Sequence, residues 1–276
     1  MLGAIRSEVR KVFTTRLWWG MALGMAALAA AIAAGFAALV GSDFTSDPET
    51  GINPFAKLSV GTAQLIYNAG LVQSFTTLFP LALGVLLITS EYRHKTITAT
   101  FLSTPKRATV LISKTVAVVL VGALYAVIHA AASVAGGAGV LAGVKGLDTM
   151  LGNSEVQKSL AIGILAMVVW TLLGFGFGML VRNQIAATLI AVGVAFLGQL
   201  ALNILFTIRE WYGAAKLLPG NLTSGMLVTA DPTLGAADPS TSVFFEHWWV
   251  SALILTGYAA ALAIAGAILT ARRDVS

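Results

Sequence analysis

Residues 17–40 read LWWGMALGMAALAAAIAAGFAALV and contain no charged side chain. A helix needs about 20 apolar residues to cross the hydrocarbon core of a bilayer, so this run is long enough to span a membrane. Five further apolar runs follow along the chain. We therefore predict an all-α membrane protein that forms a single transmembrane domain over residues 1–276. Its six spanning helices are expected at about 17–40, 69–89, 115–138, 160–181, 185–208 and 248–271.

The composition of the whole chain agrees with these runs. Of its 276 residues, 57% are hydrophobic and 11% are charged, whereas a soluble domain carries about a quarter charged residues. The chain thus lacks the polar side chains that cover a water-facing surface. Cysteine is absent, which excludes disulfides, thiolate metal sites and cysteine nucleophiles. The net charge of +5 comes from basic residues at the ends of apolar runs, a pattern typical of membrane orientation rather than of nucleic-acid binding.

The basic residues are distributed unevenly between the two sides of the predicted membrane domain. Twelve of the 17 Lys and Arg residues fall on the side that holds both termini, namely Arg6, Arg10, Lys11, Arg16, Arg93, Lys95, Lys106, Arg107, Lys114, Arg182, Arg272 and Arg273. Because Lys and Arg concentrate in cytoplasmic loops, we expect both termini in the cytoplasm.

Residues 1–16 form an amphipathic pattern ahead of the first run. The apolar residues Leu2, Ile5, Val9 and Phe13 recur at helical spacing, and the charged residues among them include Arg6, Arg10 and Lys11. Such a segment is expected to lie as a helix in the membrane interface. Two interpretations stay open: a leader that only sets the topology, and an in-plane elbow helix that also contacts a cytoplasmic partner.

Residues 90–114, between the second and third runs, are the most charged stretch and read SEYRHKTITATFLSTPKRATVLISK. A cytoplasmic loop collects basic residues in any case, but this explains neither Glu91 at the end of a span nor the apolar pair Phe101 and Leu102. Exposed apolar residues rimmed by charge indicate a docking surface. Pro105 is expected to end a short helix in this loop.

An amphipathic start, six spans and this loop together resemble the ABC-2 type permeases, the membrane subunits of ABC exporters. The loop residues that carry the resemblance are Glu91, Thr96, Leu102, Pro105, Arg107 and Lys114. Lys95 stands where many members have glycine, so the local turn is expected to differ. The resemblance covers the layout of nearly the whole chain, but its specific residues lie within one loop.

The resemblance implies an ABC-2, type V exporter-like architecture in a bacterial plasma membrane. A second permease subunit, either identical to this chain (a homodimer) or similar to it, would pair with it, and two copies of a separate ATPase subunit would bind ATP and Mg on the cytoplasmic side. The loop would act as the coupling helix that enters the ATPase, through Glu91, Arg93, Thr96, Phe101, Leu102, Pro105 and Arg107. The elbow helix, with Arg6, Arg10 and Lys11, would pack against the same partner. The cargo would be a hydrophobic drug, a lipid or a glycan.

The predicted outer loop, residues 209–247, is long and contains turn signals at Pro219, Pro232 and Pro239. Apolar residues lie between them, namely Trp211, Leu217, Leu218, Leu222, Met226 and Leu227. Short half-buried helices and a plain surface loop both agree with this pattern, and the resemblance to ABC-2 permeases implies short helices that cap the outer exit.

The chain carries no motif for its own chemistry. It lacks the Gly-x-x-x-x-Gly-Lys-Ser/Thr loop that cradles ATP phosphates, so ATP hydrolysis is expected in another chain, and this chain is expected to be no enzyme and to bind no cofactor or metal. Gly174 and Gly178 sit four residues apart in an apolar run, where small residues let helices approach closely.

Polar residues inside the predicted spans need partners, because burying them in lipid is costly. Gln199 and Asn203 lie one turn apart in the fifth span, as Tyr125 and His129 do in the third, and Gln73 lies in the second. Hydrogen bonding between helices explains all of them. The sharper hypothesis is that Gln73, Gln199 and Asn203 line the substrate path at a dimer seam.

Two rival functions stay open beside the exporter hypothesis. An ion-coupled secondary transporter usually places carboxylates inside its spans, and none occur in the six runs. A membrane enzyme requires clustered nucleophiles, bases or metal ligands, and His129 is the single ionisable candidate in the spans.

Overall fold

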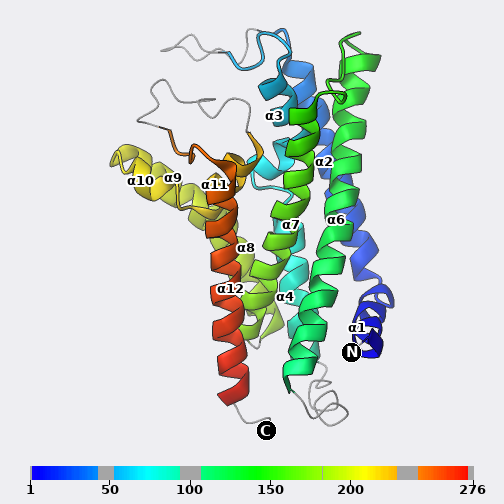
Figure 1. Cartoon of the computed structure of the whole chain (residues 1–276), viewed down its shortest axis with the longest axis vertical. Helices are drawn as coiled ribbons and strands as arrows, with labels where there is room; N and C mark the ends of the chain where they lie inside the picture. The colour runs from blue at the N-terminus through cyan, green and yellow to red at the C-terminus, as the bar shows by residue number, and fades with distance from the viewer. Residues whose placement is uncertain (1, 43–52, 94–106, 182, 229–241, 273–276) are drawn as a thin grey trace.

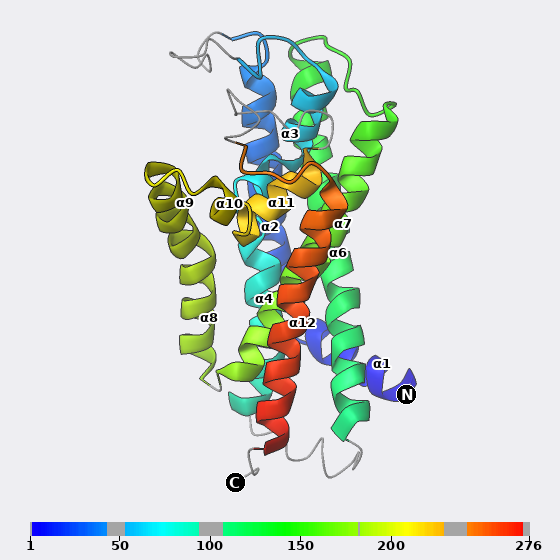
Figure 2. The same cartoon turned by 60° about the vertical axis from the view of Figure 1, so that its left-hand side comes forward.

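The structure, a computed structural model, describes residues 2–42, 53–93, 107–181, 183–228 and 242–272. All regular elements in these ranges are helices (Figures 1 and 2). They are α1 (Leu2–Phe13), α2 (Leu17–Leu39), α3 (Val60–Val72), α4 (Leu78–Arg93), α6 (Arg107–Gly143), α7 (Ser154–Leu180), α8 (Gln184–Gly193), the π-helix η2 (Val194–Gly198), α9 (Gln199–Ile208), α10 (Tyr212–Ala215), α11 (Pro219–Leu227) and α12 (Trp248–Arg272).

Five helices in the described part of the chain are long and apolar enough to cross a membrane. They cover Leu17–Leu39, Thr109–Gly143, Ser154–Leu180, Gln184–Ile208 and Trp248–Leu269. The all-α class is confirmed, and these helices are consistent with a multi-pass membrane protein. In both views α1 and the last turns of α12 lie at the same end of the bundle, which we call the basic end; the opposite end is called the far end (Figures 1 and 2).

The predicted continuous span at 69–89 is wrong, because the chain breaks there into α3 and α4. Pro80 has no N–H and would leave the carbonyl of Thr76 without a partner in an unbroken helix. Instead Pro80 lies in the first turn of α4, where no intrahelical N–H is needed, and the Thr76 carbonyl accepts from Phe79 N at 3.3 Å.

Two further residues shape this break. Ser74 has a φ of 60°, and the N–H of Thr76 turns back to the carbonyl of Gly70 at 3.1 Å. A Cβ on Gly70 would lie 2.7 Å from Cγ2 of Thr76, so the missing side chain at residue 70 leaves room for Thr76 to pack against the end of α3.

Helix α7 lies at the centre of the bundle and packs against α4, α6 and α12. Glycines allow the close approach: a Cβ on Gly174 would lie 1.9 Å from the carbonyl oxygen of Leu81, and a Cβ on Gly84 would lie 2.1 Å from that of Thr171. Gly178 similarly faces Val85 and Ile88 of α4. The predicted packing role of Gly174 and Gly178 is therefore confirmed.

Helices α8, η2 and α9 form one continuous rod that diverges from the bundle toward the far end (Figures 1 and 2). Its first part packs on α4 through the buried Ala187 and Ala191. Beyond them the rod exposes large apolar side chains, among them Val194, Leu197 and Ile204. Such a surface suits lipid or another apolar helix.

Two predicted loops are shorter than expected. The loop predicted at 90–114 is wrong at both ends, because α4 continues to Arg93 and α6 already begins at Arg107, well before the predicted start at 115. The charged residues Glu91 and Lys114 lie within α4 and α6 instead of in the loop, because they form an ion pair with each other. The predicted outer loop at 209–247 contains α10 and α11, which agrees with short half-buried helices, one of the two predicted alternatives. Leu222, Met226 and Leu227 are buried, whereas Trp211 and Leu217 are exposed.

Candidate functional site

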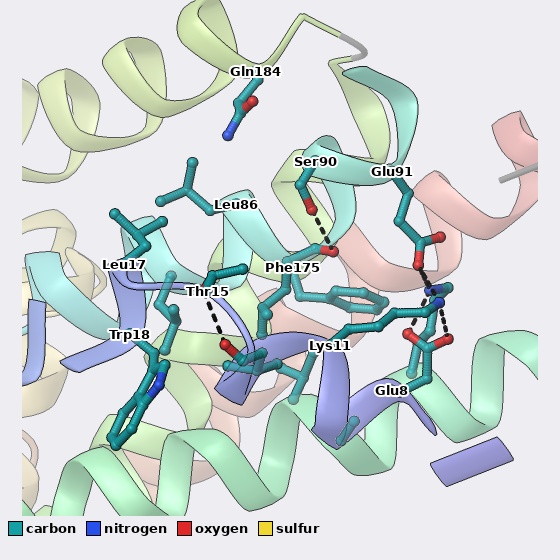
Figure 3. A pocket seen from close by; sticks show the side chains of 16 residues that line it. Glu8, Lys11, Thr15, Leu17, Trp18, Leu86, Ser90, Glu91, Phe175 and Gln184 are labelled. Carbon is teal, nitrogen blue, oxygen red and sulfur yellow. Dashed lines mark hydrogen bonds and ion pairs between the residues drawn. The ribbon is translucent and has the colours of Figure 1, made fainter. Parts of the chain in front are cut away.

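Four charged side chains meet at the basic end of the bundle (Figure 3). Glu8 and Lys11 come from α1, Glu91 from the last turns of α4 and Lys114 from α6. Lys114 Nζ donates to Glu91 Oε1 and, at 2.7 Å, to Glu8 Oε2. Lys11 Nζ donates to Glu8 Oε1 at 2.6 Å and to Glu91 Oε1 at 2.9 Å. We call these four residues the ion cluster.

The inner half of the ion cluster is almost closed to solvent. The side chains of Lys114 and Glu91 are 4% and 6% exposed, and that of Glu8 is 12% exposed. Removing one member of a buried pair leaves an uncompensated charge, which costs about 3–5 kcal/mol. Glu91 Oε2 is buried and has no hydrogen-bond partner among the described residues. The cluster therefore holds α1, α4 and α6 in one arrangement.

The pairing changes the acid–base behaviour of the two residues on α1. Burial by itself pushes the pKa of Glu8 up, but hydrogen bonds from Lys11 and Lys114 outweigh it and hold that pKa below its ordinary value. Burial pushes the pKa of Lys11 down, but the hydrogen bonds to Glu8 and Glu91 outweigh this and raise that pKa above its ordinary value. Both residues are thus held in their charged forms.

A cavity of about 120 Å³ adjoins the ion cluster. The charged side chains lie on one side of it and apolar side chains such as Leu17, Trp18 and Leu86 on the other (Figure 3). Ser90 and Gln184 also line it. The cavity is thus amphipathic, and it is bounded by α1, α2, α4, α6, α7 and the start of α8.

The predicted coupling residues divide into three groups. Glu91 belongs to the ion cluster, and Arg93 is exposed and donates to Gln184 Oε1 at 3.3 Å. Arg107 is the first residue of α6. Thr96, Phe101, Leu102 and Pro105 lie outside the described residues.

The amphipathic helix predicted within residues 1–16 forms as α1, and its three named basic residues lie in different surroundings. Arg6 and Arg10 are exposed, whereas Lys11 reaches into the ion cluster. Trp18 Nε1 donates to the carbonyl of Phe13 at 3.3 Å, and the two rings meet edge to face at 4.8 Å. These contacts fix the turn between α1 and α2.

Two of the three predicted path residues, Gln199 and Asn203, contact α11. Gln199 Oε1 accepts from the backbone N of Gly220 at 2.7 Å, and Asn203 Oδ1 accepts from Asn221 Nδ2 at 2.8 Å. Both residues thus hold the start of α11 against α9. Gln73 is exposed at the end of α3. Its neighbour Ser74 lies close to the start of α11, since a Cβ added to Gly220 would lie 2.8 Å from Ser74 Oγ.

An apolar groove of about 170 Å³ lies beside Gln199, between the diverging rod and the bundle. Its walls come from α4, α7, α8, η2, α9, α11 and α12, and Trp170, Phe177 and Leu262 are among its lining residues. Apart from Gln199, its lining residues are all hydrophobic or proline. π-Helices are rare and often mark functional sites.

The buried polar residues of α6 reach the neighbouring helices. His129 Nε2 lies 3.0 Å from Thr76 Oγ1 in the break between α3 and α4, and Tyr125 donates its hydroxyl to the carbonyl of Trp18 at 2.5 Å. Hydrogen bonding between helices, one of the two predicted roles for polar residues in the spans, is confirmed for these two side chains. Within the described part of the chain, no three His, Cys, Asp or Glu side chains gather to hold a metal.

With this geometry in view, one family model matches most of the chain, over residues 26–276. It is described as a protein of unknown function, DUF2705. The chain belongs to the DUF2705 family. No curated protein matches it. In this DUF2705 chain, Glu91 and Lys114 lie inside the matched range, and Glu8 and Lys11 lie before it.

Sequence reasoning missed how the ion cluster of this DUF2705 chain is built. Glu8 and Lys11 stand three residues apart in an amphipathic helix, which is the spacing of a helical ion pair, and this signal was available. Their joint contact with Glu91 and Lys114 had no such signal, because it depends on how α1 folds back onto the bundle.

Proposed function

We propose that this protein is the permease subunit of an ATP-driven ABC-2 type exporter in a bacterial plasma membrane, with both termini in the cytoplasm. It moves a hydrophobic or amphipathic substrate, such as a drug, lipid or glycan, outward. A separate ATPase subunit, present in two copies, binds ATP and Mg, and a second copy of the permease completes the transporter.

The observation that carries this proposal is the ion cluster. Glu91 and Lys114 stand on either side of residues 94–106, the segment in which the family resemblance puts the ATPase contact. The same two residues bind α1, the helix given an elbow role by that resemblance. A force on α1 therefore reaches α4 and α6 through buried ion pairs.

The diverging rod supports the proposed dimer and cargo. It exposes apolar side chains along its outer part, such as Val194 and Leu200, and a second copy can cover them. The groove beside Gln199 is almost wholly apolar, which suits a cargo with a hydrophobic body. In this proposal Gln73, Gln199 and Asn203 lie near the path, and the last two also hold α11.

Co-purification tests the ATPase partnership. The chain is isolated in mild detergent from the membranes of its own host, and the proteins that co-purify with it are identified by mass spectrometry. We expect one ATPase per permease and ATP-dependent transport in vesicles that vanadate blocks. Exchanging Glu91 for Gln should uncouple ATP hydrolysis from transport, while the exposed pair member Glu155→Gln, at the far end, should leave it unchanged. A permease that transports without any ATPase would contradict the proposal.

A second function, ion-coupled secondary transport, is favoured by one observation. The α3–α4 break is a discontinuous helix of the kind found at ion and substrate sites in such transporters, and the buried His129 contacts it at Thr76. Transport that an uncoupler abolishes, that vanadate leaves intact and that His129→Gln removes would establish this function in place of the first.

A further inference from the structure

The exposed charges at the basic end all have the same sign in the part of the chain that the structure describes. The two carboxylates that the structure describes at this end, Glu8 and Glu91, are turned inward into the ion cluster. The exposed charged side chains that remain are Arg6, Arg10, Lys11, Arg16 and Arg93. Lys11 is neutralised by its two carboxylate partners, and Arg93 lies at the other edge, bonded to Gln184. Three unneutralised arginines therefore gather on α1 and the turn that follows it.

Helix α1 presents these arginines in a fixed direction. Its inner side, with Glu8 and the buried Val12, faces the bundle. Arg6 and Arg10 are one turn apart and share the opposite side, since residues four apart lie on one helix face. The hydroxyl of Thr15 bonds the carbonyl of Val12 at 2.9 Å and helps to close the turn into α2. The ion cluster and this turn prevent α1 from rotating its arginines away.

Exposed apolar side chains stand beside the arginines. Phe13 is 41% exposed, Leu17 47% and Trp19 48%. Leu17 and Trp19 begin the apolar run of α2, so this surface lies where the spanning part of the chain begins. Basic groups directly next to exposed aromatic and aliphatic groups fit the boundary between lipid headgroups and acyl chains.

We propose that this surface, formed by Arg6, Arg10 and Arg16 with Phe13 and Trp19, binds anionic phospholipid headgroups. The guanidinium groups donate to lipid phosphates, for which Arg has a suitable fork of N–H donors, while Phe13 and Trp19 enter the adjacent acyl region. An acidic protein surface would match the charge but would leave these apolar side chains facing water. The binding requires only that the chain is inserted in a membrane, whatever it transports.

Tryptophan quenching by brominated lipids tests the proposal on the full chain. Trp211, Trp248 and Trp249 of the far half are changed to Phe, which leaves Trp18 and Trp19 as the reporters beside α1 and Trp170 buried in the core. The protein is reconstituted into phosphatidylcholine vesicles that contain either brominated phosphatidylglycerol or brominated phosphatidylcholine.

Each Arg near an anionic surface contributes roughly a fivefold preference for an anionic over a zwitterionic lipid. From the quenching curves we therefore expect a relative affinity for phosphatidylglycerol up to about a hundredfold above that for phosphatidylcholine. The preference should vanish near 1 M salt, where the Debye length falls to about 3 Å. The triple variant Arg6→Gln/Arg10→Gln/Arg16→Gln should lose it, and the matching triple change to Lys should keep most of it.

The control variant removes exposed basic residues at the far end, Lys57→Gln/Lys158→Gln/Arg209→Gln. It should keep the preference, because those residues lie away from the reporters. Equal quenching by the two lipids, or an unchanged preference in the arginine-to-glutamine variant, would overturn the proposal. Loss of ATPase binding in that variant without any lipid preference in the parent protein would assign the surface to an acidic protein instead.

Discussion

Replacing Lys114 with Met tests the ion cluster most directly. The change keeps a long side chain but removes the cation that binds both Glu91 and Glu8. Lys11 then remains as the one cluster cation for two carboxylates, and Glu91, 6% exposed, loses its closest partner. At 4–6% exposure the pair belongs to the buried class, so we expect a loss of about 3–5 kcal/mol in the free energy of unfolding.

The assay is unfolding in mixed micelles by increasing mole fraction of SDS, followed by far-ultraviolet circular dichroism. The double variant Glu91→Gln/Lys114→Met removes one charge of each sign and leaves Glu8 paired with Lys11. It should therefore lose less stability than the sum of the two single variants, with a coupling free energy of about 0.5–3 kcal/mol.

Lys158→Met is the matched control. Lys158 pairs with Glu155 three residues away on the same helix at 3.4 Å, and both side chains are nearly half exposed. Pairs of this kind contribute about 0.3–0.5 kcal/mol. If Lys114→Met cost no more than this control, or if the two cluster variants were additive, the cluster would not hold the three helices together.

Three further predictions concern pH, packing and the cap on α11. Because the pKa of Glu8 is lowered in the folded protein, Glu8 stabilises the fold fully above its ordinary pKa of 4.5. This stabilisation is lost as the pH falls through the lower folded pKa. Because the pKa of Lys11 is raised, Lys11 stabilises the fold fully below its ordinary pKa of 10.5, and this stabilisation is lost as the pH rises through the higher folded pKa. Spin labels on α1 and α6 should report separation of the helices in the acidic and alkaline windows and none near neutrality. Gly84→Ala should cost about 1–3 kcal/mol or more by overpacking against a carbonyl of α7, whereas Gly139→Ala, which meets nothing within 4 Å, should be neutral or slightly stabilising in the same SDS unfolding assay. Gln199→Leu should cost about 1–3 kcal/mol because it leaves the backbone donor at the start of α11 without its acceptor, and faster hydrogen exchange confined to α11 would distinguish this effect from general unfolding.

Local pattern was sufficient for much of the fold because apolar runs report directly on helices that cross a membrane. The run at 17–40 predicted α2 within a residue at its far end, and the run at 248–271 predicted α12 equally well. The spacing of Gly174 and Gly178 predicted a close helix contact, because a missing side chain has the same effect whichever helix approaches.

The break at residues 73–77 shows where local pattern fails. An apolar run that contains Pro80 is compatible with a kinked helix and with two helices. Whether the helix kinks or breaks depends on the contacts that Gly70, Ser74 and Thr76 make in the folded protein. Thr76 contacts His129, which lies on another helix. The same applies to Gln199, whose partner is the backbone of α11.

The run 17–40 and the other apolar runs by themselves determined the helical class and the apolar surface, and the basic residues at their ends determined the unequal distribution of charge between the two ends. Those properties follow from hydropathy and charge, which each segment carries alone. Tertiary structure alone decided that the side chains of Glu91 and Lys114 point into the bundle. It also decided that Glu8 is paired inside the ion cluster, so that the exposed side of α1 carries arginines. A charge is stable inside a bundle only when another helix brings its counter-charge within hydrogen-bond distance, and no single segment carries that information.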